Sequence, residues 1–170
     1  MKRETTPLEE GLTKGAETQI EKIIGGYPKA KLVWEALKDD PFIRGLWEMS
    51  DYIAVTKMHY NAHGDTHAKV VTANALNILD ILVKKGIEID TVSDGIGDVD
   101  DAYLIVLAAA LLHDVGNQIR RENHNDMSVI LAIPVLNQLL PKIYEDAMKL
   151  AQIRGSILHC IGTHMEEVKS

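Results

Sequence analysis

Apolar positions recur with helical spacing along most of the chain, and no segment shows the strict alternation of a β-strand. Thr6-Pro7 followed by Glu9 and Glu10 is typical of a helix start, and Gly25-Gly26 is typical of a helix end. Further helices are expected over residues 28–38, 41–55, 65–85, 102–113, 125–140 (kinked at Pro134) and 141–168, with a loop over 87–101. The pattern therefore predicts an all-α fold, a helical bundle.

The length of the chain suits a single compact domain, because 170 residues with 46% apolar side chains can bury one core of ordinary size. Within it we expect residues 1–58 to form N-terminal helices that pack on a core formed by residues 59–170. Asp98, Asp100 and Asp101 come just before the helix expected at 102–113, where acidic side chains favour a helix start.

The charge balance narrows the range of partners. Lys plus Arg total 18 against 25 Asp plus Glu, a net charge of -7, which argues against general binding to nucleic acid or to an anionic membrane. The longest apolar run, 103–112, is too short to span a bilayer. A single cysteine, Cys160, cannot form an internal disulfide, so we expect a cytoplasmic location.

Histidines are the most informative residues, because four predicted helices end an apolar stripe in an imidazole or a carboxylate. Val71, Ala75, Ile78, Leu79 and Leu82 lead back to His67; Leu107, Ala110 and Leu111 lead to Asp114, beside His113; Met127 and Leu131 lead back to His124; Ala147, Leu150, Ile157 and Ile161 lead to His164. Any one of these histidines is equally well explained as a hydrogen-bonded core residue. Burying several titratable groups without a partner is costly, however, and a divalent cation is a partner that imidazole and carboxylate share.

Two motifs add a resemblance to these observations. His67 begins the stretch His-Ala-Lys-Val, and LLHDVGN places the His113-Asp114 doublet at the end of an Ala/Leu-rich helix. From about residue 60 to residue 168 the chain resembles the HD-domain metal-dependent phosphohydrolases, whose pattern is a His, a later His-Asp doublet and a still later Asp. His124 and His164 resemble the extra histidines of the family members that hold two metal ions.

The resemblance implies a fold, a cofactor and a reaction. The fold would be a bundle of the HD-domain type, holding one or two divalent ions on His67, His113, Asp114, His124 and His164. The ligand types do not distinguish Mn, Mg, Fe, Ni, Co and Zn. A metal-activated water would cleave a small phosphorylated substrate, either a phosphomonoester, a nucleotide or a phosphodiester. Asp114 and Lys69 would be catalytic, and His63, Lys69, Arg120 and Arg121 would bind the substrate.

One departure from the family pattern keeps a second function open. No Asp follows His164 in the sequence, whereas the pattern has a last Asp there. The alternative is a non-catalytic HD-like module that binds a metal or a nucleotide in a regulatory role. A plain helical interaction domain with core histidines is a third hypothesis. The N-terminal helices either pack on the core or pair with another subunit, so a homo-oligomer stays open.

Overall fold

The computed structural model describes residues 6–59 and 64–165, and within these ranges the chain is helical without a strand, which confirms the all-α prediction. The elements are α1 (Pro7–Ile24), α2 (Pro28–Leu37), α3 (Pro41–Asp51), the π-helix η1 (Tyr52–Lys57), α4 (Asp65–Lys84), α5 (Asp90–Ser93), α6 (Val99–Leu112), the 3₁₀ helix η2 (Val115–Gln118), α7 (His124–Leu139), the 3₁₀ helix η3 (Leu140–Lys142) and α8 (Ala147–Thr163). None of the helices in the described ranges combines the length and the apolar character that crossing a membrane requires.

The helix starts follow local capping chemistry. Thr6 and Glu9 form a capping box at α1, with Pro7 in the first turn, as the sequence predicts. Asp98 and Asp101 form a second capping box at α6, which therefore begins at Val99, three residues earlier than expected.

Two predicted segments differ from the structure. The loop expected over 87–101 contains the short helix α5 and the start of α6. The helix expected over 141–168 is divided, because Pro141 lies in η3 and α8 begins only at Ala147, where Asp146 caps it by accepting from the backbone N–H of Lys149. A proline near the start of a helical turn therefore does not ensure that a longer helix follows.

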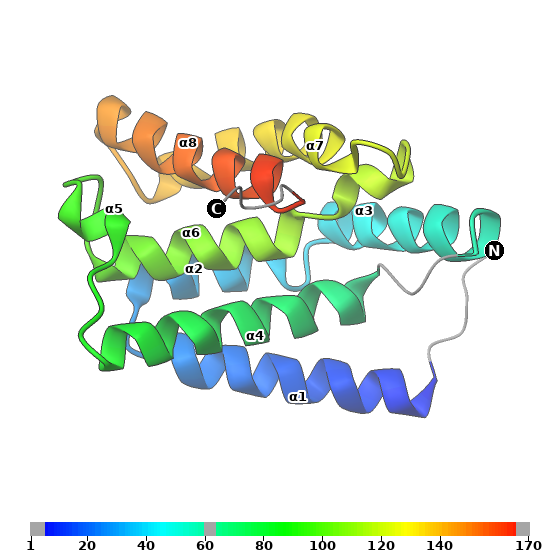
Figure 1. The fold of residues 1–170 in the computed structure, drawn as a ribbon. Coiled ribbons are helices and arrows are strands. Elements are labelled where there is room, and N and C mark those ends of the chain that lie inside the picture. Colours follow the sequence, from blue (N-terminus) through cyan, green and yellow to red (C-terminus); the bar gives the residue numbers. More distant parts are fainter. Residues whose placement is uncertain (1–5, 60–63, 166–170) are drawn as a thin grey trace.

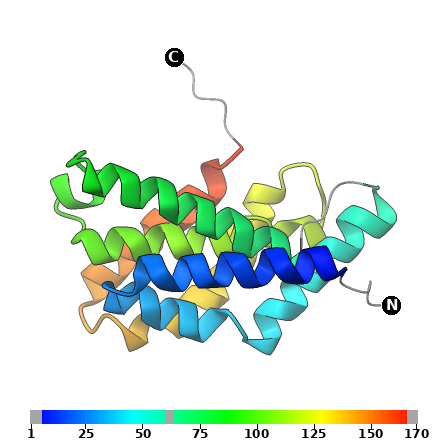
Figure 2. The same ribbon diagram turned by 90° about the horizontal axis from the view of Figure 1, so that it is seen from below.

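Helix α6 lies at the centre of the molecule (Figure 1) and packs against α2, α4 and α8. Eleven of its 14 residues are buried, which agrees with a helix that is apolar all round. Figure 2 shows α1 lying along α4 on one side, and α7 packs against α8 and η2 on the other. The N-terminal helices join the same core: Trp47 of α3 is buried and its Nε1 donates to the carbonyl of Leu111 at 2.8 Å.

The buried face of helix α4 agrees only in part with the predicted one. Leu79 of the expected stripe is buried, but Ile78 and Leu82 remain 59% and 38% exposed, whereas Thr72 and Leu76 are fully buried. Small side chains such as Ala68 and Ala73 line the buried face, where α4 packs against both α1 and α6. The predicted stripe is therefore wrong at Ile78 and Leu82, because helices that pack closely accommodate small residues at the contact.

Candidate metal centre

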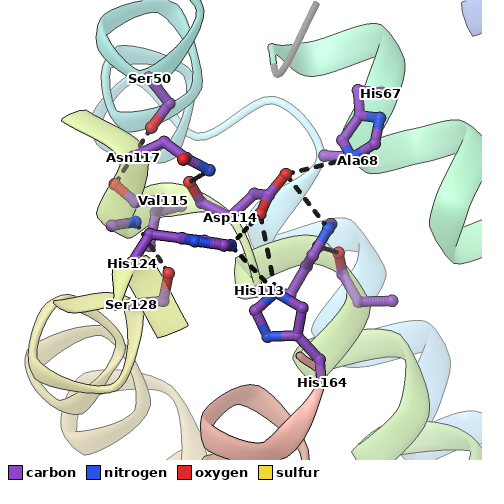
Figure 3. A network of polar contacts seen from close by, with 12 residues as sticks. Ser50, His67, Ala68, His113, Asp114, Val115, Asn117, His124, Ser128 and His164 are labelled. Carbon is purple, nitrogen blue, oxygen red and sulfur yellow. Dashed lines mark hydrogen bonds and ion pairs between the residues drawn. The ribbon is translucent and has the colours of Figure 1, made fainter. Parts of the chain in front are cut away.

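The five predicted metal ligands come together around the carboxylate of Asp114 (Figure 3). They arrive from four places in the fold. His67 lies in the first turn of α4, His113 and Asp114 follow the end of α6, His124 begins α7, and His164 follows the end of α8.

Each oxygen of Asp114 faces its own pair of imidazoles. Oδ2 lies 3.2 Å from Nε2 of His67 and 3.4 Å from Nε2 of His113. Oδ1 lies 3.0 Å from Nε2 of His124 and 3.8 Å from Nε2 of His164. Asp114 is thus shared by two groups of three side chains, and within each group the ligand atoms lie within 4.8 Å of one another.

Backbone carbonyls orient three of the four rings. The Nδ1 atoms of His113, His124 and His164 lie 2.8, 3.0 and 2.7 Å from the carbonyl oxygens of Ala110, Arg121 and Ile161, respectively. A carbonyl oxygen only accepts hydrogen bonds, so Nδ1 carries the proton and Nε2 of each neutral ring presents a lone pair to Asp114. This is the tautomer that a metal ligand needs.

The contact between His124 and His164 brings two acceptor nitrogens together. Nε2 of His124 and Nε2 of His164 lie only 3.2 Å apart, and both face the Asp114 carboxylate. With Nδ1 protonated on both neutral rings, no hydrogen atom lies between these acceptors, and a cation or an additional proton must fill the space. Nitrogen and carboxylate ligands are the set preferred by divalent first-row ions, so both groups could hold a metal ion.

Burial acts against the charged form of both His164 and His113, but the net pKa shifts of the two rings differ. Burial lowers the pKa of His164, and the neighbouring rings of His113 and His124 lower it further. The residue is exposed overall, but its side chain keeps only 20% of its accessible surface, so the exposure is at the backbone of the helix end. For His113 burial also acts against the charged ring, but Asp114 would accept a hydrogen bond from that charged ring and attracts its charge, which outweighs burial and raises the pKa of His113.

Three side chains that were not predicted support the doublet. Asn117 donates from its backbone N–H and from Nδ2 to the carbonyl of Asp114, at 3.0 and 3.1 Å. Ser50 Oγ donates to the carbonyl of Val115 at 3.1 Å, and Ser128 Oγ accepts from the N–H of Gly116 at 2.8 Å. Of these, only Asn117 gave a signal in the sequence, as the last residue of LLHDVGN.

Gly116 allows the doublet and α7 to approach closely. A Cβ atom at this position would lie 2.1 Å from the carbonyl oxygen of His124 and 2.5 Å from the backbone nitrogen of Ser128. No side chain fits at these distances, so glycine is required for His124 to reach Asp114.

The other predicted site residues lie apart from the ligand groups. Lys69 is buried between carboxylates, with its Nζ 2.7 Å from Glu17 and 2.9 Å from Asp65, and these hydrogen bonds raise its pKa although burial opposes the charge. Arg120 is exposed, and Arg121 donates to Asn117 Oδ1 at 3.0 Å. His63 lies outside the described residues.

The chain is similar to a protein of an archaeon. The uncharacterized protein MJ1020 of Methanocaldococcus jannaschii is 36% identical to this chain over 156 residues. The match covers 91% of this chain and 59% of that protein, so the chain spans about three fifths of its relative's length. No family model matches the chain, and no solved structure matches it.

Proposed function

We propose that the protein is a metal-dependent phosphohydrolase whose centre holds two divalent cations bridged by Asp114. The observation that carries the proposal is the division of the carboxylate, with two imidazoles on Oδ1 and two on Oδ2. Paired cations are a common device for displacement at phosphorus. The resemblance of His67 and the His113-Asp114 doublet to the HD-domain phosphohydrolases supports the same reaction.

The donor set fits this cofactor. His67, His113 and Asp114 Oδ2 would hold one ion, and His124, His164 and Asp114 Oδ1 the other. When bound, divalent cations acidify water and neutralise the charge on phosphoryl oxygens. Each group supplies three ligand atoms from the chain, which leaves coordination positions for water and substrate, as in catalytic sites.

The protein's own residues fix the geometry of the centre. Carbonyls at the ends of α6 and α8 and in the segment before α7 hold the rings of His113, His164 and His124. The side chain of His124 is 3% exposed and that of His67 is 31% exposed, so substrate reaches the centre from the side of His67. The predicted substrate roles of Lys69, Arg120 and Arg121 stay predictions, as does the cytoplasmic location.

One observation favours the alternative of a regulatory metal-binding module. Among the described residues, Asp114 is the sole carboxylate in either ligand group, whereas the family pattern has a second Asp. A site without this second carboxylate can bind a cation and still lack hydrolytic activity.

The decisive experiment measures metal content and turnover on the same untagged protein. We expect two equivalents of divalent metal per chain and metal-dependent hydrolysis of 4-nitrophenyl phosphate with Mn²⁺, Mg²⁺, Ni²⁺ or Co²⁺. His124→Ala should reduce both quantities. His159→Ala is the matched control, because His159 is exposed on α8 outside both groups. Bound metal without turnover would establish the regulatory module, and a protein without bound metal would overturn both functions.

A further inference from the structure

A cavity of about 940 Å³ adjoins the candidate metal centre. It lies between α1, α3, η1 and the first turn of α4, and His67 belongs both to its lining and to one ligand group. Its volume is in the range of small-molecule sites. A hydrogen bond of 2.8 Å between the hydroxyls of Thr13 and Thr66 connects α1 to α4 at the cavity wall.

The lining of the cavity is strongly acidic. Among the described residues, six carboxylate side chains line it: Glu9, Glu10, Glu17, Glu48, Asp51 and Asp65. The basic side chains that the described part of the lining contributes besides His67 are those of Lys14 and Arg44. Lys69 lies behind the wall and pairs with Glu17 and Asp65.

An acidic cavity next to a phosphate-binding centre constrains the substrate. With cations held by the ligand groups, the phosphoryl group would bind there, and the alcohol part of the ester would extend past His67 into the cavity. Carboxylates only accept hydrogen bonds, so they favour hydroxyl and amino groups. They repel a second phosphate or a carboxylate on the substrate, because like charges at short range are unfavourable.

Resting on the proposed function, we infer that the cavity selects phosphomonoesters whose alcohol part is cationic or rich in hydroxyl and amino donors. Polyphosphates and esters that carry a second anionic group are disfavoured. The acidic residues of α1 and α3 thereby determine specificity, while the histidines and Asp114 hold the reacting end.

The test compares phosphoethanolamine with phosphoglycolate, two esters of nearly equal size whose alcohol parts carry opposite charges. Binding to the Mn²⁺-loaded chain is measured by calorimetry, and turnover is measured alongside. We expect phosphoethanolamine to bind about tenfold more tightly. The double variant Glu10→Gln/Glu48→Gln should reduce this preference at least roughly threefold, because it removes two negative charges from the wall. Glu88→Gln/Glu145→Gln is the matched control, since it removes two exposed charges outside the cavity.

The outcomes separate this inference from the proposed function. Preferential binding of phosphoethanolamine without hydrolysis of any ester, 4-nitrophenyl phosphate included, supports the cavity's specificity and overturns the hydrolase. Hydrolysis with equal binding of the two esters, or a preference that the cavity variant leaves unchanged, supports the hydrolase and overturns the inference. If neither ester binds, the inference is overturned whatever the turnover.

Discussion

A buried aspartate lies near each end of helix α6, Asp101 in its first turn and Asp114 two residues after its last residue. Cationic side chains surround Asp101, whereas imidazole rings surround Asp114. Asp101, 1% exposed, lies 2.8 Å from Nζ of Lys29, 2.8 Å from Nζ of Lys149, and accepts from the hydroxyl of Tyr144 at 2.6 Å. Burial acts to raise the pKa of Asp101, but these hydrogen bonds and those of the cap outweigh it and hold the pKa well below the usual range. The chain itself supplies every cation that this carboxylate needs.

Asp114, at the other end, is 7% exposed and faces ring nitrogens. Its imidazole partners His113, His124 and His164 use their Nδ1 protons on backbone carbonyls, so the neutral rings offer the carboxylate only lone pairs. At Asp101 cationic side chains face the carboxylate, whereas at Asp114 three neutral rings turn an acceptor nitrogen toward it. The comparison shows how a cluster that could hold a metal ion differs from an ordinary buried salt bridge.

The same substitution at the two ends should have opposite consequences. Asp114→Asn removes the bridging ligand, and we expect metal-dependent hydrolysis to fall by at least about 100-fold. The new amide donates a hydrogen bond to an imidazole, so the melting temperature of the metal-free protein should stay constant or rise. Asp126→Asn, an exposed position two residues after His124, is the control. Near-native turnover of Asp114→Asn would exclude a centre built on this carboxylate.

At the opposite end, Asp101→Asn leaves Lys29 and Lys149 without the charge that both contact. Breaking a buried ion network by removing one partner costs about 3–5 kcal/mol, which urea unfolding should detect. The metal content should not change, because α6 separates this network from the ligand groups. A loss of bound metal equal to that of Asp114→Asn would mean that the two ends are not independent.

The two ends should also lose their stabilisation in different pH ranges. Metal needs neutral imidazoles, so the difference in stability with and without a chelator should be present at pH 7.5 and vanish near pH 5. At a free metal concentration of 100 times Kd, this difference in the free energy of unfolding amounts to about 2.7 kcal/mol. The lowered pKa of Asp101 gives stability that is present above the unfolded pKa of about 3.9 and is lost only as pH falls below it. Melts at pH 7.5, 5 and 3 distinguish the two contributions, and a melt that chelator leaves unchanged at pH 7.5 would contradict a metal-stabilised fold.

The sequence predicted much of this arrangement, for identifiable reasons. Capping signals are local, so Thr6 marked the start of α1 correctly and the acidic residues before 102 located the start of α6 to within three residues. The five clustered residues were identified because polar groups at the ends of apolar stripes are conspicuous and because the doublet has a recognisable context. His67 lies in the cluster although part of the stripe predicted for α4 is exposed, because a residue in the first turn can face a neighbouring helix end from the edge of the interface.

What the sequence could not reveal depends on backbone groups and on tertiary packing. The carbonyls that fix the ring tautomers belong to the peptide chain and carry no residue signal. Ser50 contacts the carbonyl of Val115, and Ser128 contacts the N–H of Gly116, so their roles depend on how α3 and α7 approach η2. Lys69 illustrates the converse: its position in a motif suggested catalysis, whereas its two carboxylate partners favour a structural role.

The close approach of α7 can be tested at Gly116. Gly116→Ala places a methyl group against the backbone of His124 and Ser128, so α7 must shift away from the doublet. Overpacking of this kind costs about 1–3 kcal/mol, and we expect the metal group containing His124 to weaken while the group containing His67 persists. Gly15→Ala in α1 is the control, because nothing lies within 4 Å of its added Cβ and a helical alanine is favourable. Equal losses of both bound metal ions would show that the groups do not form separately.

The smallest expected effect concerns two adjacent arginines, Arg120 and Arg121. Substituting each one should show whether it supports the metal centre or binds the substrate. Arg121 donates to Asn117, which in turn holds the carbonyl of Asp114, whereas its neighbour Arg120 is exposed. Arg121→Ala should lower metal affinity about tenfold, which is the lower end of the range for residues that orient ligands. The effect should be this small because the backbone carbonyl of residue 121, which holds His124, remains after the change. Arg120→Ala should leave metal affinity unchanged and, if Arg120 contacts substrate, should raise KM alone. Metal titration and KM values of the two variants distinguish these roles. If Arg121→Ala leaves metal affinity unchanged and raises KM, this arginine binds the substrate, as the sequence predicts.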